Sequence, residues 1–185
     1  ALVNDLLDVA RIESTAGTFH LERADLRGLV RDVAGELRPL LEARQLQLAL
    51  QLGEQPLLAR VDPTRFQQVV RNVLANAIRF SPPGAALRVD GEAADVDGQP
   101  HIWLRVCDQG PGIPPEELDK IFEAFVQSSK TKDGSGGTGL GLAISRKILQ
   151  AHGGRIHAEN NPLGGATFHI SLPARGFGAT QPLPA

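Results

Sequence analysis

Two glycine clusters in the second half of the chain have the composition best suited to binding a ligand. The first is DQGPGI at residues 108–113, and the second is GSGGTGLGLAIS at residues 134–145. Glycine lets the backbone approach a bulky ligand and adopt positive φ without a Cβ penalty. Because the second cluster leads directly into an apolar helical pattern, its free N–H groups and the positive end of the helix favour a phosphate chain. Together the clusters indicate a nucleotide.

A polar face on the helix predicted for residues 63–80 could bind a cation. The face consists of Arg65, Gln68, Asn72, Asn76 and Arg79. An amide oxygen suits a Mg²⁺ ion that is already bound to phosphates, because this ion keeps several waters and needs only one or two protein ligands. A plain solvated face would give the same pattern, so this helix alone leaves both interpretations open.

Asp108 follows an apolar strand pattern and begins the first glycine cluster. A carboxylate at this position can accept a hydrogen bond from an exocyclic amine, while the glycines let a flat ring lie against the backbone. Taken alone, a DxGxG sequence is more often a turn. The five histidines share no spacing typical of metal ligands, and we interpret them as structural.

Two familiar nucleotide-binding motifs are excluded. Residues 134–139 formally match GxGxxG, but they follow a polar loop and no βαβ unit surrounds them. No lysine follows the glycines at the spacing of a P-loop. The sequence therefore favours neither a dinucleotide-binding fold nor a P-loop fold.

Composition narrows the class of protein further. A chain of 185 residues can bury one compact core. Its 19 basic and 21 acidic residues give a net charge of −2, which indicates no general affinity for nucleic acid. Cys107 is the only cysteine, so an internal disulfide is excluded. The chain begins within an amphipathic pattern and contains no Met, and we expect it to be a piece of a longer protein.

The patterns of apolar residues predict both helices and strands. Helices are expected over residues 25–44, 63–80 and 139–152, with a short helical pattern at 115–125. Strands are expected at 19–21, 45–52, 57–61, 86–92, 102–107, 155–159 and 166–172, with a hairpin around 97–98. Because hairpins lie beside helices without strict βαβ alternation, we predict an α+β fold. It would be a two-layer α/β sandwich in which a mixed, mostly antiparallel sheet packs on about three helices.

Five segments occur in the order and spacing of the sequence boxes of sensor histidine kinases: RNVLANAIRFS, DQGPGI, IFEAFVQ, GGTGLGLAIS and GATFHISLP. The chain therefore resembles the catalytic ATP-binding domain of that family. This domain has a Bergerat-type fold, shared with gyrase, mismatch-repair and heat-shock chaperone ATPases. The resemblance covers residues 18–173. Residues 1–16 resemble the end of the dimerisation and phosphoacceptor hairpin, and residues 174–185 are expected to form a mobile tail.

The resemblance implies a role for each matching residue. Asn76 would be the Mg²⁺ ligand, with Asn72 near the phosphates. Arg79 stands where the family usually has a lysine. It would face a phosphate together with Lys130, which lies in the polar lid segment between the two glycine clusters. Asn76, Arg79 and Lys130 are therefore the candidate catalytic residues, and Asp108 would bind the adenine amine.

The remaining residues of the implied site would line or enclose the nucleotide. The base pocket would contain Gly110, Gly112 and Ile113, and Thr167 would approach the base. The lid, a polar segment between the two glycine clusters, would be anchored by Phe122 and Phe125. The triphosphate would be wrapped by Gly137, Thr138, Gly139, Leu140 and Gly141, with Leu142 below.

The resemblance implies transfer of the γ-phosphoryl group of ATP, bound with Mg²⁺, to a histidine of the hairpin. The phosphoryl group would then pass to an aspartate of a response regulator or receiver domain. The segment that carries the phosphoacceptor histidine in the family is absent from this sequence, so the chain alone could not complete autophosphorylation. A homodimeric parent is implied, with this domain in the cytoplasm and an anchor that could lie in the inner membrane.

Two other functions are compatible with parts of this pattern. An ATPase clamp of the gyrase or chaperone kind needs a glutamate on the asparagine-bearing helix, but Asn72 stands four residues before Asn76. Steady ATP hydrolysis by the isolated chain would favour that alternative. A nucleotide-sensing module with degenerate chemistry is the second alternative, and a failure to bind Mg²⁺·ATP would favour it.

Overall fold

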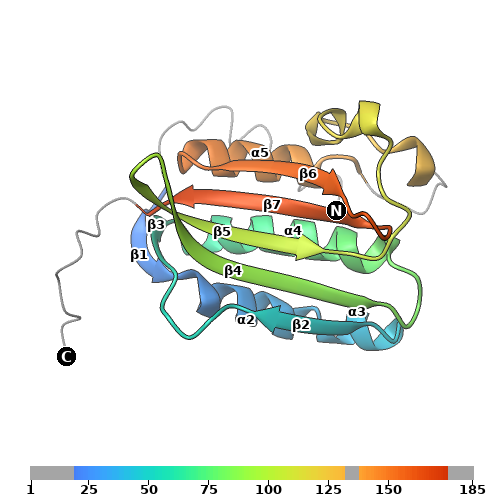
Figure 1. Cartoon of the computed structure of the whole chain (residues 1–185), viewed down its shortest axis with the longest axis horizontal. Helices are drawn as coiled ribbons and strands as arrows, with labels where there is room; N and C mark the ends of the chain where they lie inside the picture. The colour runs from blue at the N-terminus through green and yellow to red at the C-terminus, as the bar shows by residue number, and fades with distance from the viewer. Residues whose placement is uncertain (1–18, 132–137, 175–185) are drawn as a thin grey trace.

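The computed structural model describes residues 19–131 and 138–174, in which a five-stranded sheet covers a layer of helices (Figure 1). The strands follow the order β2 (Gln47–Gln51), β4 (Ala86–Val96), β5 (Gln99–Cys107), β7 (Ala166–Pro173) and β6 (Arg155–Asn160). Only β2 and β4 run parallel, and the other three pairs are antiparallel. This arrangement confirms the predicted α+β sandwich with a mixed, mostly antiparallel sheet.

Three helices lie side by side behind the sheet in Figure 1: α2 (Leu26–Glu36), α4 (Pro63–Phe80) and α5 (Gly141–Ala151). The middle helix, α4, buries Phe66, Val69, Val70, Val73, Leu74, Ala77 and Ile78. Burial of each large apolar side chain contributes roughly 1.5–3 kcal/mol. The apolar face of α4 is therefore a main part of the core that holds the two layers together.

The ends of α4 follow from local chemistry. Asp62 caps its start, where the carboxylate accepts the N–H of Arg65 at 3.1 Å, and Pro63 occupies the first helical position. The Asp62 N–H also donates to Nε2 of His152 at 2.9 Å, which joins the start of α4 to the end of α5. The helix ends at Phe80 because two prolines follow at residues 82–83.

The helix predicted for residues 25–44 is in fact two helices. α2 ends at Glu36, and α3 (Arg38–Ala43) begins after Leu37. Pro39 causes this break because it has no N–H to donate and its ring crowds the preceding turn. The predicted N-terminal cap was correct, since the Asp25 carboxylate accepts the Arg27 N–H at 3.1 Å.

Two shorter predictions were also wrong in detail. The strand expected at residues 19–21 is instead β1 (Glu22–Asp25), which pairs with β3 (Leu58–Val61) in a separate two-stranded sheet. Its position is fixed by the register with β3, which the sequence pattern of one strand does not contain. The helical pattern at 115–125 forms two separate 3₁₀ turns, η1 (Pro115–Glu117) and η2 (Lys120–Phe122), instead of one α-helix. Short turns of this kind are the usual form of 3₁₀ structure.

The hairpin between β4 and β5 was predicted correctly. Asp97 and Gly98 form its turn with φ of 52° and 74°. Two successive positive φ values match the right-handed twist of the strands, which explains the Asp-Gly sequence. Within the described ranges, no helix combines the length and hydropathy needed to cross a bilayer. Two expected segments lie outside the described residues: the end of the hairpin at residues 1–16, and the tail from residue 175 onward.

Two glycines test how tightly the layers pack. We expect Gly154→Ala to lower the free energy of unfolding by about 1–3 kcal/mol, because a Cβ there would lie 2.4 Å from the Ser171 carbonyl oxygen. Gly28→Ala, on an exposed turn of α2 with no atom within 4 Å, is the matched control. That change should raise the free energy of unfolding by up to about 1 kcal/mol through helix propensity. Urea unfolding measures both, and equal effects would contradict the packing shown here.

Candidate nucleotide-binding site

A cavity of about 270 Å³ brings together α4, the start of α5 and the segment after β5. It is lined by both Asn76 and Asp108, the two residues on which the predicted site depends. The other predicted residues in its lining are Asn72, Arg79, Gly112, Ile113, Thr138, Gly139, Gly141 and Leu142. The amide-bearing helix, the first glycine cluster and the described part of the second, from Thr138 onward, therefore meet at one cleft.

Asp108 fixes the loop that follows β5. Its side chain is 7% exposed, and its Oδ1 atom accepts the N–H of Gly110 at 2.8 Å and the N–H of Ala166 at 3.0 Å. Burial raises the pKa of this carboxyl group above its ordinary value of 3.8, and the two N–H donors partly oppose that rise. No residue in the described ranges donates to the second oxygen, Oδ2, and Asp108 is part of the cavity lining.

The turn between β6 and β7 supports the same loop through two asparagines that the sequence did not single out. Asn160 accepts the Ile113 N–H at 2.8 Å and donates to the Ile113 carbonyl oxygen at 2.7 Å. Asn161 donates to the Asp108 carbonyl oxygen at 3.2 Å. Both sides of the loop are therefore held by side-chain amides. An Asn-Asn pair before two glycines signals only a turn, so the sequence carried no sign of this contact.

The part of the cavity where the sequence predicts phosphates is built around the start of α5. Asn72 donates to the Gly141 carbonyl oxygen at 3.0 Å and to the Ser145 hydroxyl at 3.3 Å, so its amide joins α4 to α5. Gly139 has a φ of +69°, and a Cβ there would lie 2.9 Å from the backbone of Phe125. Glycine is therefore required at this position. The positive end of the α5 dipole faces the cavity, as anion binding requires.

The remaining polar groups fit a metal that arrives together with phosphates. Asn76 offers a neutral amide oxygen to the cavity, while Asp108 is the only carboxylate among the described residues in the lining. One carboxylate, which already accepts two N–H groups, is too few to hold a hard cation in the absence of a nucleotide. A Mg²⁺ ion coordinated by phosphates and water could take Asn76 as its protein ligand.

Several predicted residues lie near the cavity without lining it. They are Gly110, Phe122, Lys130, Leu140 and Thr167, whereas Gly137 lies outside the described residues. The Lys130 ammonium group donates to the Pro111 carbonyl oxygen at 3.1 Å. The Phe122 ring packs edge-to-face against Phe168 with centroids 6.2 Å apart, and the Arg146 guanidinium lies 5.6 Å from its centroid. Phe122 therefore anchors its segment to β7 and α5.

Thr167 shows where the period of a strand matters. Its hydroxyl donates to Asn161 Oδ1 at 2.6 Å, and its neighbours Ala166 and Phe168 line the cavity instead. Side chains alternate between the two faces of a strand, so adjacent residues cannot both face the cavity. The alternation in GATFHISLP could have identified Ala166 and Phe168. The cavity residues Ile121, Val126, Gln127 and Ser128 belong to the predicted lid segment, and no motif in the sequence marks them individually.

Comparisons with known proteins identify the class of protein that has this fold and cavity. Residues 61–176 match the family described as "Histidine kinase-, DNA gyrase B-, and HSP90-like ATPase". The chain belongs to this family. Within it, the chain is a catalytic ATP-binding domain of the sensor histidine kinase type.

Individual relatives support that assignment. The chain is 40% identical over 173 residues to the sensor protein KdpD of Escherichia coli (strain K12), covering 93% of this chain and 18% of KdpD. A crystal structure of full-length ShkA in complex with AMPPNP has a TM-score of 0.78 at 31% identity, over 94% of this chain and 35% of that one. The mycobacterial sensor histidine kinase MprB has a TM-score of 0.69 at 31% identity, over 84% of this chain and 98% of that one. The chain thus spans about a fifth of the length of KdpD.

Two adjacent glycines test the contact between the β6–β7 turn and the Asp108 loop. Gly164 and Gly165 both have positive φ, but a Cβ on Gly165 would lie 2.1 Å from the Asp108 carbonyl oxygen, whereas one on Gly164 would meet nothing within 4 Å. We expect Gly164→Ala to cost about 1 kcal/mol of stability for its backbone conformation alone. Gly165→Ala should cost at least 1 kcal/mol more and weaken nucleotide binding. Urea unfolding and nucleotide titration of both variants check this, and equal losses would contradict it.

The pH dependence of stability should report the buried Asp108 carboxyl group. Because its pKa is raised in the folded state, its favourable contribution is present below the unfolded pKa and is lost as pH rises through the folded pKa. Asp108→Asn keeps an oxygen for the Gly110 and Ala166 N–H groups but cannot ionise. We therefore expect the stability of the variant relative to the wild type to increase as pH rises from about 4, and then to level off. Urea unfolding without nucleotide measures this difference, and a flat difference would exclude a raised pKa.

Proposed function

We propose that this domain binds ATP with Mg²⁺ and transfers the γ-phosphoryl group to a histidine on a separate dimerisation hairpin. The observation that carries the proposal is the convergence of Asn76, Asp108 and the start of α5 on one cavity. The same cavity therefore offers an acceptor for a base, N–H groups for phosphates and an oxygen for a metal. A relative of similar fold was crystallised with AMPPNP, an ATP analogue, which supports ATP as the nucleotide.

In this proposal the adenine lies against the loop that follows β5. Asp108 Oδ2 accepts a hydrogen bond from the exocyclic amine, since Oδ1 is already engaged by Gly110 and Ala166. Gly112 lets this loop pass close to Asn160, because L side chains rarely adopt its φ of +72° and an ideal Cβ there would lie 2.9 Å from Asn160 Oδ1. Ile113, held by Asn160, supplies an apolar surface.

The triphosphate would extend toward α5. Backbone N–H groups around Thr138, Gly139 and Gly141 would donate to its oxygens, and the Arg79 guanidinium would balance its charge. Leu140 and Leu142 would support this turn from below. Lys130 lies in the lid segment, where its ammonium group donates to the Pro111 carbonyl oxygen. Rotation of its side chain would let it contact a phosphate instead. Gly137 and Thr167 remain candidates from the family pattern alone.

Asn76 would hold the Mg²⁺ ion, which neutralises charge on the phosphates when bound. Phosphoryl transfer requires mainly positioning and charge neutralisation, and this set of residues supplies both. The acceptor histidine and the group that takes its proton would belong to the hairpin of the same or the partner protomer. Relay to an aspartate of a response regulator or receiver domain would follow in a homodimeric parent protein.

A mixing experiment tests this function. The full chain, γ-labelled ATP and Mg²⁺ are combined with a separately expressed phosphoacceptor hairpin of the parent protein. We expect acid-labile label on the hairpin histidine, because a phosphoramidate bond is cleaved by acid. Asn76→Ala should slow the labelling by at least about 100-fold, since the metal loses its protein ligand.

Gln67→Ala is the matched control for Asn76→Ala. Gln67 carries the same carboxamide chemistry on α4 but does not line the cavity, so its loss should leave labelling unchanged. If the chain binds Mg²⁺·ATP but labels no histidine, the transfer step is wrong. If steady hydrolysis accompanies binding, the chain acts as an ATPase clamp, and an absence of binding would exclude the site itself.

A further inference from the structure

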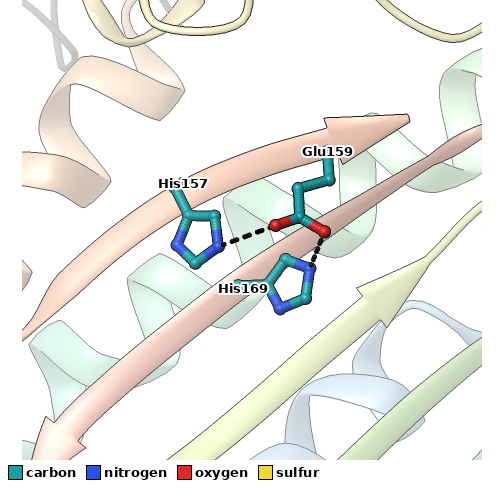
Figure 2. A group of neighbouring side chains, drawn as sticks. All are labelled: His157, Glu159 and His169. Carbon is teal, nitrogen blue, oxygen red and sulfur yellow. Dashed lines mark ion pairs between the residues drawn. The ribbon is translucent and has the colours of Figure 1, made fainter. Parts of the chain in front are cut away.

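Three side chains that could bind a metal meet on the outer face of the sheet, away from the helices. His157 on β6 lies opposite His169 on β7 in the strand register, and Glu159 follows His157 by two residues (Figure 2). Residues two apart on a strand point to the same face. No spacing in the sequence predicts this cluster, because only the pairing of β6 with β7 brings the two histidines together.

The donor atoms of the cluster have separations close to those of a metal site. Glu159 Oε1 lies 3.6 Å from His157 Nε2, and Glu159 Oε2 lies 3.4 Å from His169 Nε2. One ligand atom from each residue falls within 4.8 Å of the other two. In a tetrahedral zinc site with bonds of about 2.0–2.2 Å, ligand atoms are roughly 3.3–3.6 Å apart. The three donors are therefore close enough to bind one ion after rotation of the imidazole rings, which are stacked when no ion is bound.

The two imidazole rings are stacked, with centroids 4.5 Å apart and planes inclined by 4°. The side chain of His169 is only 16% exposed, and its buried Nε2 atom makes no hydrogen bond within the described residues. A buried nitrogen without a hydrogen bond is costly unless another group satisfies it. Glu159 approaches this nitrogen without reaching hydrogen-bonding geometry, and a metal ion placed between them would satisfy both.

The charge around the cluster also bears on cation binding. Burial lowers the pKa of His169, as do His157 and Arg105, while Glu159 opposes that shift. Arg105 lies beside His169 on β5, but its guanidinium is ion-paired with Glu92 of β4, which limits the repulsion of a cation.

We propose that His157, Glu159 and His169 bind one zinc ion or a similar transition-metal ion, with water completing its coordination. Two imidazoles and one carboxylate are a ligand set that zinc uses when a coordination position stays open. Mg²⁺ would not compete, because it prefers oxygen ligands in octahedral geometry. The ion would join β6 to β7 directly beside Asn160, so it would stabilise the turn that holds Ile113 and Asp108.

The test uses the full chain after treatment with a chelator and without nucleotide. We expect calorimetric titration with Zn²⁺ to give one equivalent bound, and thermal unfolding to shift upward when Zn²⁺ is added. His157→Gln, His169→Gln and Glu159→Gln should each weaken binding by at least about tenfold, because each removes a ligand. Unfolding of these variants in chelator shows whether the fold is retained, and Glu159→Gln, at an exposed position, keeps the test valid if a histidine variant unfolds.

Two control variants separate this site from other zinc-binding groups. His101→Ala removes another histidine of the outer face on β5, and Cys107→Ser removes the only thiol, which lies on the same face next to Thr167. Both should bind Zn²⁺ as the wild type does, and Mg²⁺ should not shift the unfolding temperature. Absence of stoichiometric Zn²⁺ binding, or binding unaffected by the three ligand variants, would overturn the proposal. Loss of binding in Cys107→Ser would do the same by assigning the ion to the thiol. Because no nucleotide is present, none of these outcomes depends on the proposed kinase function.

Discussion

One carboxylate oxygen connects the parts of this domain that must meet around a nucleotide. Asp108 Oδ1 accepts the N–H of Gly110, within its own loop, and the N–H of Ala166, at the start of β7. These two bonds fix the loop after β5 against a strand more than fifty residues away in the chain. Because Oδ1 is engaged inside the protein and no described residue donates to Oδ2, Oδ2 is the oxygen that we propose accepts the base amine. The cost of burying this charge appears as the raised pKa of the carboxyl group.

The second constraint is that α4 serves the core and the cavity at once. Its apolar face, with Phe66 and Leu74 almost fully buried, is packed in the core. The opposite face places Asn72 and Asn76 at the cavity, and the Asn72 amide reaches across to Gly141 and Ser145 of α5. Rigid packing on one side of the helix therefore sets the position of the two amides on the other side. A shift of this helix would disturb both the core and the cavity.

Most of the elements could be predicted because their signals are local. The Asp-Pro start of α4, the prolines after Phe80 and the Asp-Gly turn between β4 and β5 each act within a few residues. The errors arose where a partner distant in sequence decided the outcome, as in β1, whose limits depend on its register with β3. The break at Leu37 is different, because Pro39 is a local signal that the sequence contains and that accounts for the end of α2.

The sequence by itself determined the fold class, the family and the two residues on which the proposed site depends, Asn76 and Asp108. These features depend on residue types at short spacings, which one chain segment contains in full. Only the tertiary structure showed that Asn160 and Asn161 hold the loop after β5, and that Thr167 does not line the cavity that its neighbours line. It alone brought His157 and His169 together. The physical reason is strand register, because the pairing of two strands decides which distant side chains share a face, and no single strand encodes that choice.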